Sequence, residues 1–348
     1  MAKKKKKGAG GKPLPAAMLD LITGYWVSQL VHVVAKLGLA DLLKEGPKSP
    51  ADLARSVGAD PQTLHRVLRA LAGVGVFAER KDGRFALTPL GATLRSDRPD
   101  SMRAFAIMMV ADYWFEAWAD LLQSVKTGQT AFDRVHGLKI FDYFGKHPDK
   151  AREFGEAMTS ISGTENPVVA AAYDFSKVGT LVDVGGSHGH LLAAILKANR
   201  KLKGVLFDLP QVLDQARSAP YVGAREIAGR IELAPGDFFR SVPAGGDAYI
   251  MKYIIHDWDD DLCVKILENC RRAMAPNGRV LVVDAVIPPG NDPHWGKLLD
   301  LNMLVGPGGR ERTRSEFAEL FKRAGLKLRR IIPTASPLSI VEGVSDSR

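Results

Sequence analysis

The chain has 348 residues, of which 46% are hydrophobic and 25% are charged, and its formal net charge is +9 at pH 7. This length exceeds that of a usual single domain, so we expect two domains with a large buried core. No uninterrupted apolar run approaches the roughly 18 residues of a membrane span, and the basic N-terminus leads into GAGGKPLP rather than an apolar signal segment. These features predict a soluble, cytoplasmic protein without a membrane partner.

Much of the positive charge lies at the N-terminus. Lys3–Lys7 and Lys12 supply six positive charges in a Gly- and Pro-containing segment that cannot bury apolar surface. We therefore predict a disordered basic tail over residues 1–18, followed by a mildly basic body. This distribution favours a solvated tail over a nucleic-acid partner, and a weak contact with a polyanion is the alternative.

Residues 19–100 have the pattern of a winged helix. Ser49 is placed to cap one helix, and Pro61 stands at the first position of a second helix. A β-hairpin is then predicted around Asp82-Gly83, a dipeptide typical of tight turns.

A winged helix can bind DNA. In a transcription factor the second helix would enter the major groove and bring Arg66 and Arg69 close to the duplex. The alternative is that both arginines are ordinary solvent-facing residues of a helix with another purpose.

Residues 101–174 are predicted to be helical and carry many large side chains. Aromatic residues at helical spacing normally pack against other helices, so most of these side chains should be core. The large side chains are Phe105, Met108, Met109, Tyr113, Trp114, Phe115, Trp118, Phe132, Phe141, Tyr143, Phe144 and Met158.

A strand, a glycine turn and a helix start follow in LVDVGGSHGH, which begins at Leu181, and a second strand ends on Asp208. Gly185 and Gly186 let the backbone approach a ligand closely, because they have no Cβ. The pattern departs from G-x-G-x-x-G at Ser187 and His190, so a dinucleotide fits poorly. Asp208 is placed to accept hydrogen bonds from ribose hydroxyls. Together these features favour an adenosine ligand without a diphosphate, such as S-adenosylmethionine.

A metal site is not expected. Cys263 and Cys270 are the only cysteines, and seven residues of helix separate them by about 10 Å, beyond disulfide reach. They should be reduced core residues. The acidic run that begins with His256-Asp257 places consecutive side chains in divergent directions, so it suits a helix N-terminus better than an ion.

The motifs of the C-terminal half closely resemble those of the S-adenosylmethionine-dependent O-methyltransferases that modify small phenolic molecules, a family with plant caffeate and hydroxyindole enzymes and a bacterial polyketide-tailoring branch. The similarity covers roughly residues 20–345. It rests on GDFF from Gly236, DAYIMKYIIHDWDDD from Asp247, GRVLVVDAVIPPGN from Gly278, KLLDLNMLV from Lys297, GGRERT from Gly308 and IIPTASPLSIVEG from Ile331.

The resemblance implies an α/β fold: a class I, Rossmann-like domain with a mostly parallel seven-stranded sheet, and an N-terminal winged-helix dimerisation domain. The implied domains are a dimerisation domain over 19–100, a helical linker and acceptor-pocket roof over 101–174, and a cofactor-binding catalytic domain over 175–348. A homodimer is therefore expected. DNA binding becomes the less favoured use of the winged helix.

For catalysis, a phenol with a pKa near 10 needs a base that works near neutral pH, and imidazole suits this task. His256 ends a predicted strand and lies in the His-Asp-Trp motif that holds the family's base, so we expect it to be the general base. The family also has two acids near its histidine, which correspond to Asp284 and Glu311. Many relatives carry glutamate where this chain has Asp284, so its role is less certain than that of Glu311.

For the cofactor, the resemblance assigns Gly185 to the turn, Asp208 to the ribose, Asp237 and Phe238 to the adenine, and Lys252 to the carboxylate side. Each has a physical reason: a carboxylate accepts from an amine, a ring covers a ring, and an ammonium offsets a carboxylate. Ser187 replaces a third glycine of relatives and suits the turn only if its φ is negative.

For the acceptor, methionine and aromatic surfaces adapt to flat rings. We expect Trp114, Phe144 and Met158 from the helical roof to contact it, together with Asn302 and Met303, which resemble positions that border the acceptor.

The sequence thus predicts methyl transfer to a phenolic or enolic hydroxyl of a small aromatic metabolite. Two alternatives remain: a relative that binds S-adenosylmethionine but catalyses decarboxylation or hydroxylation, and a winged-helix regulator that senses the cofactor.

Overall fold

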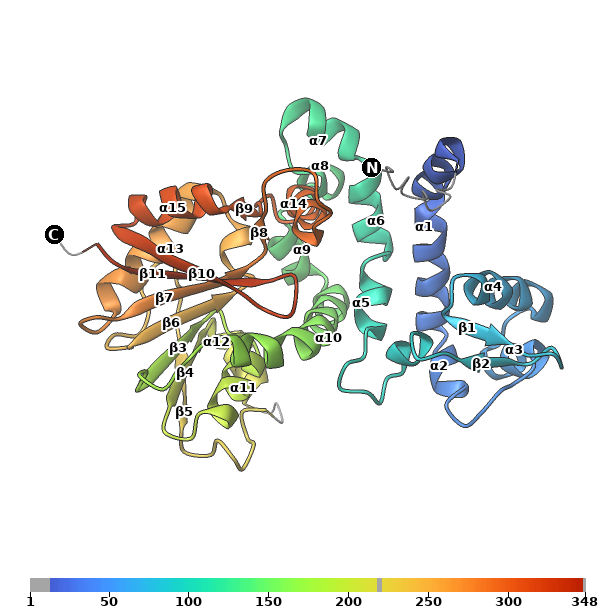
Figure 1. Ribbon diagram of the computed structural model, residues 1–348, viewed down its shortest axis with the longest axis horizontal. Coiled ribbons are helices and arrows are strands. Elements are labelled where there is room, and N and C mark those ends of the chain that lie inside the picture. The colour runs from blue at the N-terminus through green and yellow to red at the C-terminus, as the bar shows by residue number, and fades with distance from the viewer. Residues whose placement is uncertain (1–12, 218–220, 347–348) are drawn as a thin grey trace, which may run out of the picture. The chain divides into compact units, whose positions relative to one another are not determined.

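The computed structural model describes residues 13–217 and 221–346, and the chain divides into two compact units, Met1–Ala111 and Asp112–Arg348 (Figure 1). The lysine-rich segment before residue 13 lies outside the described residues, and the prediction of a disordered tail up to residue 18 is wrong at its end, because α1 already begins at Leu14. The elements of the first unit are α1 (Leu14–Lys36), α2 (Leu39–Leu42), α3 (Pro50–Val57), α4 (Pro61–Gly73), β1 (Phe77–Glu79), β2 (Phe85–Leu87), the 3-10 helix η1 (Gly91–Leu94) and α5 (Arg103–Met108).

The first unit has the predicted winged-helix pattern. Ser49 caps α3 by accepting a hydrogen bond from the Asp52 amide at 3.1 Å, and Pro61 is the first residue of α4. β1 and β2 pair as an antiparallel hairpin. Its connection is longer than the predicted two-residue turn, because the Arg80 amide bonds to the Arg84 carbonyl and Gly83 adopts a φ of 75°.

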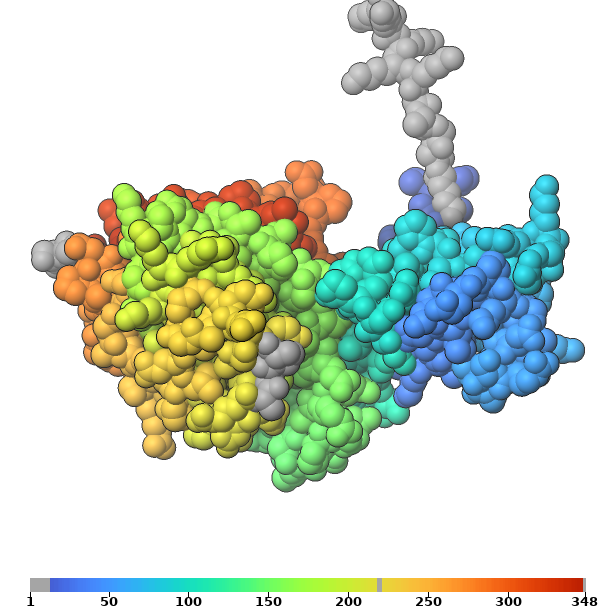
Figure 2. Space-filling view, turned by 90° about the horizontal axis from the view of Figure 1, so that it is seen from below, coloured from blue at the N-terminus to red at the C-terminus, as the bar shows by residue number. Residues whose placement is uncertain are grey.

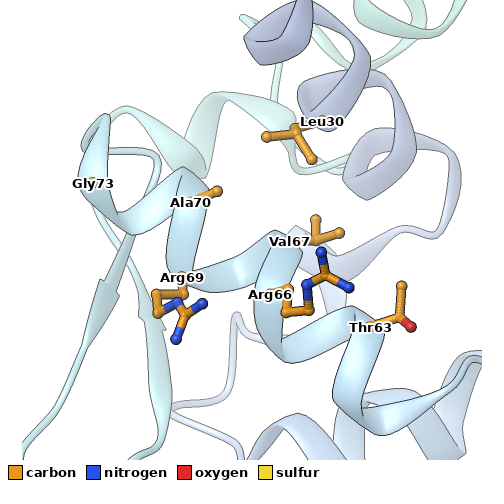
Figure 3. A pocket seen from close by; sticks show the side chains of 7 residues that line it. All are labelled: Leu30, Thr63, Arg66, Val67, Arg69, Ala70 and Gly73. Atoms are coloured by element: carbon orange, nitrogen blue, oxygen red, sulfur yellow. The ribbon is translucent and has the colours of Figure 1, made fainter.

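α1 and α4 enclose a shallow groove of about 600 Å³ (Figure 3). Arg66 and Arg69 line it from α4, and both are exposed, as expected of solvent-facing residues. α1 also presents large apolar side chains: Leu14, Leu21 and Ile22 are 84%, 76% and 63% exposed. Among the described helices, α1 alone is long and apolar enough to cross a membrane, by length and composition.

The second unit begins with helices and continues as an α/β domain. Its helices are α6 (Asp112–Ala119), α7 (Leu121–Thr127), α8 (Ala131–His136), α9 (Ile140–Lys146), α10 (Pro148–Ala172), α11 (His190–Ala198), α12 (Pro210–Ala216), η2 (Ile255–Asp257), α13 (Asp260–Ala273), α14 (Trp295–Val305) and α15 (Arg314–Arg323). Its strands are β3 (Thr180–Val184), β4 (Lys203–Asp208), β5 (Ile231–Pro235), β6 (Ala248–Lys252), β7 (Arg279–Asp284), β8 (Val286–Ile287), β9 (Arg312–Thr313), β10 (Leu326–Pro333) and β11 (Ser339–Ser345).

Seven of these strands form one sheet in the order β10-β11-β7-β6-β3-β4-β5. β10 and β11 are antiparallel to their neighbours, and the other pairs are parallel, so the predicted mostly parallel sheet is confirmed. The strand order reverses at β3, and open α/β sheets bind ligands at such a point, which here is at the carboxyl ends of β3, β4 and β6.

Helices cover both faces of this sheet. α10, α11, α12 and α14 pack on one face, and α13 and α15 pack on the other. Residues 221–230, yellow in Figure 2, lie on the surface of this unit. Cys263 and Cys270 are buried in α13 as free thiols, and Asp259 caps that helix through the Leu262 amide at 2.9 Å, both as predicted.

Candidate active site

The glycine turn after β3 requires a residue without a side chain. Gly185 has a φ of +68°, and a Cβ on it would lie 2.5 Å from Cδ1 of Ile254 and 3.6 Å from Cε1 of Phe238. The predicted turn residue and the predicted adenine-side ring are therefore close together. Gly185 also donates its N–H to the Phe207 carbonyl at 2.8 Å, which joins the turn to β4.

Ser187 does not keep the negative φ on which its fit to the turn depended. Its φ is +52°, a conformation that costs a non-glycine residue about 1 kcal/mol. The Ser187 N–H donates to Oδ2 of Asp208 at 2.8 Å, and this bond to a carboxylate offsets the strain.

The two predicted nucleoside-binding carboxylates lie at the ends of neighbouring strands. Asp208 accepts the amides of Ser187 and Leu209 at 2.8 and 2.7 Å, which uses two of its roughly four lone-pair sites. Oδ1 of Asp237 accepts the Phe239 amide at 2.8 Å. Because the amide of Gly236 bonds to the Asp208 carbonyl at 3.0 Å, the two acids belong to one backbone cradle.

Asp183 lies beside the glycine turn and was not assigned from the sequence. It is 2% exposed, and its Oδ2 has no hydrogen-bond partner among the described residues. Burial, with the neighbouring Asp208, raises the pKa of Asp183 to about 7. A Cβ on Gly186 would lie 2.7 Å from Oδ2 of Asp183, so the glycine turn packs on this carboxylate. The signal in the sequence was an acid within an apolar strand.

Lys252 ends β6 but directs its ammonium toward α10. Its Nζ donates to Ser162, Glu165 and Asn166 at 3.1, 3.0 and 2.9 Å. An ammonium has three N–H donors, so all of them are used here. A contact with the cofactor carboxylate, as the resemblance implied, would require one of these bonds to be exchanged.

The predicted base and its first partner meet directly. Nδ1 of His256 lies 2.7 Å from Oε1 of Glu311, and the Glu311 side chain is fully buried. Burial is the main cause that raises the pKa of Glu311 to about 8, and Asp300 adds to it. The Asp257 carboxylate, not assigned from the sequence, lies 3.4 Å from Nε2 of His256, and burial raises its pKa to about 6.

Asp284 does not hydrogen-bond to His256 in the described structure. Its Oδ1 accepts the backbone N–H of Tyr253 at 3.1 Å, and its Oδ2 has no partner among the described residues. Burial raises the pKa of Asp284 to about 7. The Asp284 side chain, one methylene shorter than glutamate, thus bonds to the backbone of Tyr253, which precedes His256 in the chain.

Two residues of the Gly-Gly-Arg-Glu-Arg-Thr motif hold the segment around His256. Arg312 is 1% exposed and donates to the carbonyls of Ile255 and Trp258 at 3.0 and 3.1 Å. A Cβ on Gly309 would lie 1.9 Å from the His256 carbonyl oxygen, so only glycine fits there. The base and Glu311 are therefore held together by backbone contacts as well as by their own bond.

The predicted acceptor residues are only partly brought together. Asn302 accepts the indole N–H groups of Trp114 and Trp118, each at 3.1 Å. Phe144 reaches Trp114 through Phe154, whose ring lies 4.8 Å from Phe144 and 6.5 Å from Trp114. The two remaining predicted residues make no contact with this group that is described: Met303 is buried in the core of the unit, and Met158 is half-buried on α10.

Comparison with known proteins identifies the family. Residues 118–327 match the O-methyltransferase domain, and residues 19–97 match the O-methyltransferase dimerisation domain. The chain is 47% identical over 334 residues to phenazine O-methyltransferase PhzM of Lysobacter antibioticus, covering 96% of this chain and 97% of that protein.

Two further relatives show the range of the family. CalO1, a methyltransferase in calicheamicin biosynthesis whose crystal structure contains S-adenosylhomocysteine, superposes with a TM-score of 0.86 at 38% identity, covering 96% of this chain and 100% of that one. The 8-amino-8-demethylriboflavin N,N-dimethyltransferase of Streptomyces davaonensis is 36% identical over 320 residues, which is 91% of each chain. The chain belongs to the family of S-adenosylmethionine-dependent O-methyltransferases.

Proposed function

We propose that this enzyme methylates a phenolic or enolic hydroxyl of a small aromatic metabolite, with His256 as the general base and Glu311 as its partner. The observation that carries this proposal is the 2.7 Å contact between Nδ1 of His256 and Oε1 of Glu311. When Glu311 is ionised it accepts a hydrogen bond from Nδ1–H, which places the lone pair that acts as a base on Nε2, beside Asp257.

The donor and the protein supply different parts of the reaction. S-adenosylmethionine supplies a methyl group on a positively charged sulfur. The protein would hold the acceptor hydroxyl in line, and Nε2 of His256 would take its proton as the oxygen–carbon bond forms and the methyl–sulfur bond breaks to leave S-adenosylhomocysteine. Glu311 balances the imidazolium charge, because it is a buried carboxylate in direct contact with the ring.

The residues at the carboxyl ends of β3, β4 and β5 fit the donor. The Asp208 carboxylate has lone pairs left for ribose hydroxyls, and Asp237 can accept from the adenine amine. Gly185 keeps the turn open, and the Phe238 ring can cover the adenine. Lys252 contributes to this site only indirectly, because its three N–H groups donate hydrogen bonds to residues of α10.

For the acceptor we propose a flat aromatic molecule bounded by Trp114, Phe144, Met158, Asn302 and Met303. A hydroxylated phenazine is a suitable first probe, because a relative with 47% identity is a phenazine O-methyltransferase. Aromatic amines form a second class, because another relative is an N,N-dimethyltransferase.

We also propose a homodimer formed through the first unit. The apolar side chains of α1 are exposed in the single chain, and residues 19–97 match a dimerisation domain. Burying them against a second copy would remove this apolar surface from water. Light scattering should show a dimer that Leu21→Glu with Ile22→Glu dissociates, whereas Leu298→Glu, 67% exposed on α14, leaves it intact. A monomeric wild-type protein, or one that sediments with lipid vesicles, would contradict this assignment.

Turnover and binding test the activity together. We would titrate the protein with S-adenosylmethionine and measure S-adenosylhomocysteine formation with phenols and matched aromatic amines, using wild-type protein and His256→Ala. Loss of phenol methylation in the variant with donor binding retained supports the proposal. Undiminished phenol turnover in His256→Ala contradicts the base assignment. Donor binding without transfer to any acceptor favours a non-methylating activity, and salt-dependent binding of a DNA duplex favours a regulator.

A further inference from the structure

Tyr253 stacks on the imidazole of His256. The two ring centroids lie 4.9 Å apart, and the ring planes differ by 23°. The imidazole is contacted at both nitrogens, by Glu311 at 2.7 Å from Nδ1 and by Asp257 at 3.4 Å from Nε2. A stacked aromatic neighbour adds a restraint on the ring plane, because tilting the ring away loses face-to-face contact. The Tyr253 ring therefore helps to set the plane of the imidazole and with it the direction of Nε2.

The far end of the Tyr253 ring is anchored to α10. Its hydroxyl donates to Oε1 of Glu165 at 2.6 Å, and the other carboxylate oxygen of Glu165 accepts the Lys252 ammonium at 3.0 Å. The side chains of Glu165 and Lys252 are only 5% and 8% exposed, so solvent competes little for these bonds. The ring is thus held by a buried chain of hydrogen bonds.

The backbone of Tyr253 is strained. Its φ is +58°, which is an outlier for a bulky residue, and such strain persists only where surrounding contacts enforce it. Its N–H is shared between the Val283 carbonyl at 3.2 Å and Oδ1 of Asp284 at 3.1 Å. Asp284 therefore holds the strained residue in place through its backbone N–H.

We propose that Tyr253 is a positioning residue for His256, with its hydroxyl held by Glu165 and its backbone held by Asp284. The inference rests on the proposed function, because it assigns Tyr253 to the orientation of that base. It also gives Asp284 a role one step removed from the reaction.

Kinetics of Tyr253→Leu and Tyr253→Phe test the proposal. Leucine removes the stacked ring, and we expect kcat to fall about 3- to 10-fold while KM for S-adenosylmethionine stays unchanged within about twofold. Phenylalanine keeps the ring and loses only the hydrogen bond to Glu165, so the kcat of this variant should lie between those of wild type and the leucine variant.

Tyr249→Phe is the matched control: this buried β6 tyrosine donates to the Pro243 carbonyl at 2.5 Å, away from the base. The Tyr249→Phe variant should have a lower melting temperature than the wild type and nearly the same kcat. Unchanged kcat in Tyr253→Leu, or equal loss in Tyr253→Phe and Tyr253→Leu, would overturn the proposal.

A second readout does not depend on turnover. In protein labelled with ¹⁵N-histidine, the ring signals of His256 are identified by their absence in His256→Ala. Narrow signals in wild type and Tyr253→Phe, with broadened or averaged signals in Tyr253→Leu, support positioning of the ring. Identical signals in all three proteins overturn it. If the wild-type protein methylates no acceptor, the proposed function fails while this measurement still decides the role of Tyr253.

Discussion

Replacing Glu311 by glutamine removes the charge beside His256 and keeps nearly the same side-chain volume. For unit charges 2.7 Å apart, Coulomb's law gives about 6 kcal/mol at an effective dielectric constant of about 20. The amide oxygen still accepts from Nδ1, so part of this interaction survives. We expect the transition state to lose about 2–4 kcal/mol, which corresponds to about a 30- to 1000-fold fall in kcat.

The assay compares initial rates of S-adenosylhomocysteine formation at pH 9, where Glu311 with a pKa of about 8 is ionised in the wild type. Glu319→Gln is the matched control, because that carboxylate is 63% exposed on the neighbouring helix α15. Its kcat should equal that of wild type. Glu311→Gln should keep its melting temperature at this pH, since a neutral amide avoids the desolvation of a buried charge.

A kcat of Glu311→Gln within about threefold of wild type at pH 9 would refute the reasoning. It would mean that the imidazolium does not form in the rate-determining step, or that Glu311 does not stabilise it. A large loss in both Glu311→Gln and Glu319→Gln would instead indicate a general effect on folding.

Three further outcomes follow from the geometry. Because burial raises the pKa of Glu311 to about 8, kcat of the wild type should rise with pH through that value and then level off, and a flat profile between pH 6 and 9 would be contrary evidence. Gly309→Ala should destabilise the protein by at least about 3 kcal/mol in urea unfolding, since its Cβ would lie 1.9 Å from the His256 carbonyl; Gly145→Ala, with open space around its Cβ, should be neutral or slightly stabilising. Ser187→Gly should stabilise by up to about 1 kcal/mol, because it relieves a φ of +52°, and donor affinity measured by titration should stay within about threefold; a large loss of affinity would show that the serine side chain binds the donor.

The sequence predicted what depends on local pattern. Periodicity and turns indicated the winged helix, the family resemblance implied the mostly parallel sheet, and the glycine turn with Asp208 indicated a nucleoside ligand. The strand end placed His256, and family motifs added Glu311. These two side chains are 55 residues apart in the chain, yet the structure brings them into contact.

The features that the sequence did not reveal share a physical cause, which is that they depend on the reach of a side chain or on distant partners. Asp284 is one methylene shorter than glutamate, and only three-dimensional geometry shows that it ends on the Tyr253 amide. The ammonium of Lys252 is bound by residues about 90 positions earlier, on α10. The positive φ of Ser187 accompanies its bond to Asp208, and no propensity of serine would indicate it.

The position of β11 between β7 and β10 has a consequence for synthesis of the protein. β7 carries Asp284 at its end, and until residues 339–345 leave the ribosome its outer edge has no strand to pair with. During that interval the nascent chain exposes an apolar strand edge of the kind that recruits other chains. Glu342, fully buried in β11 and bonded to the Tyr173 hydroxyl at 2.9 Å, then closes the sheet onto the segment after α10. Chaperone demand should therefore be highest just before residues 339–345 emerge, when β3, β4 and β6 have been made but the sheet is still open.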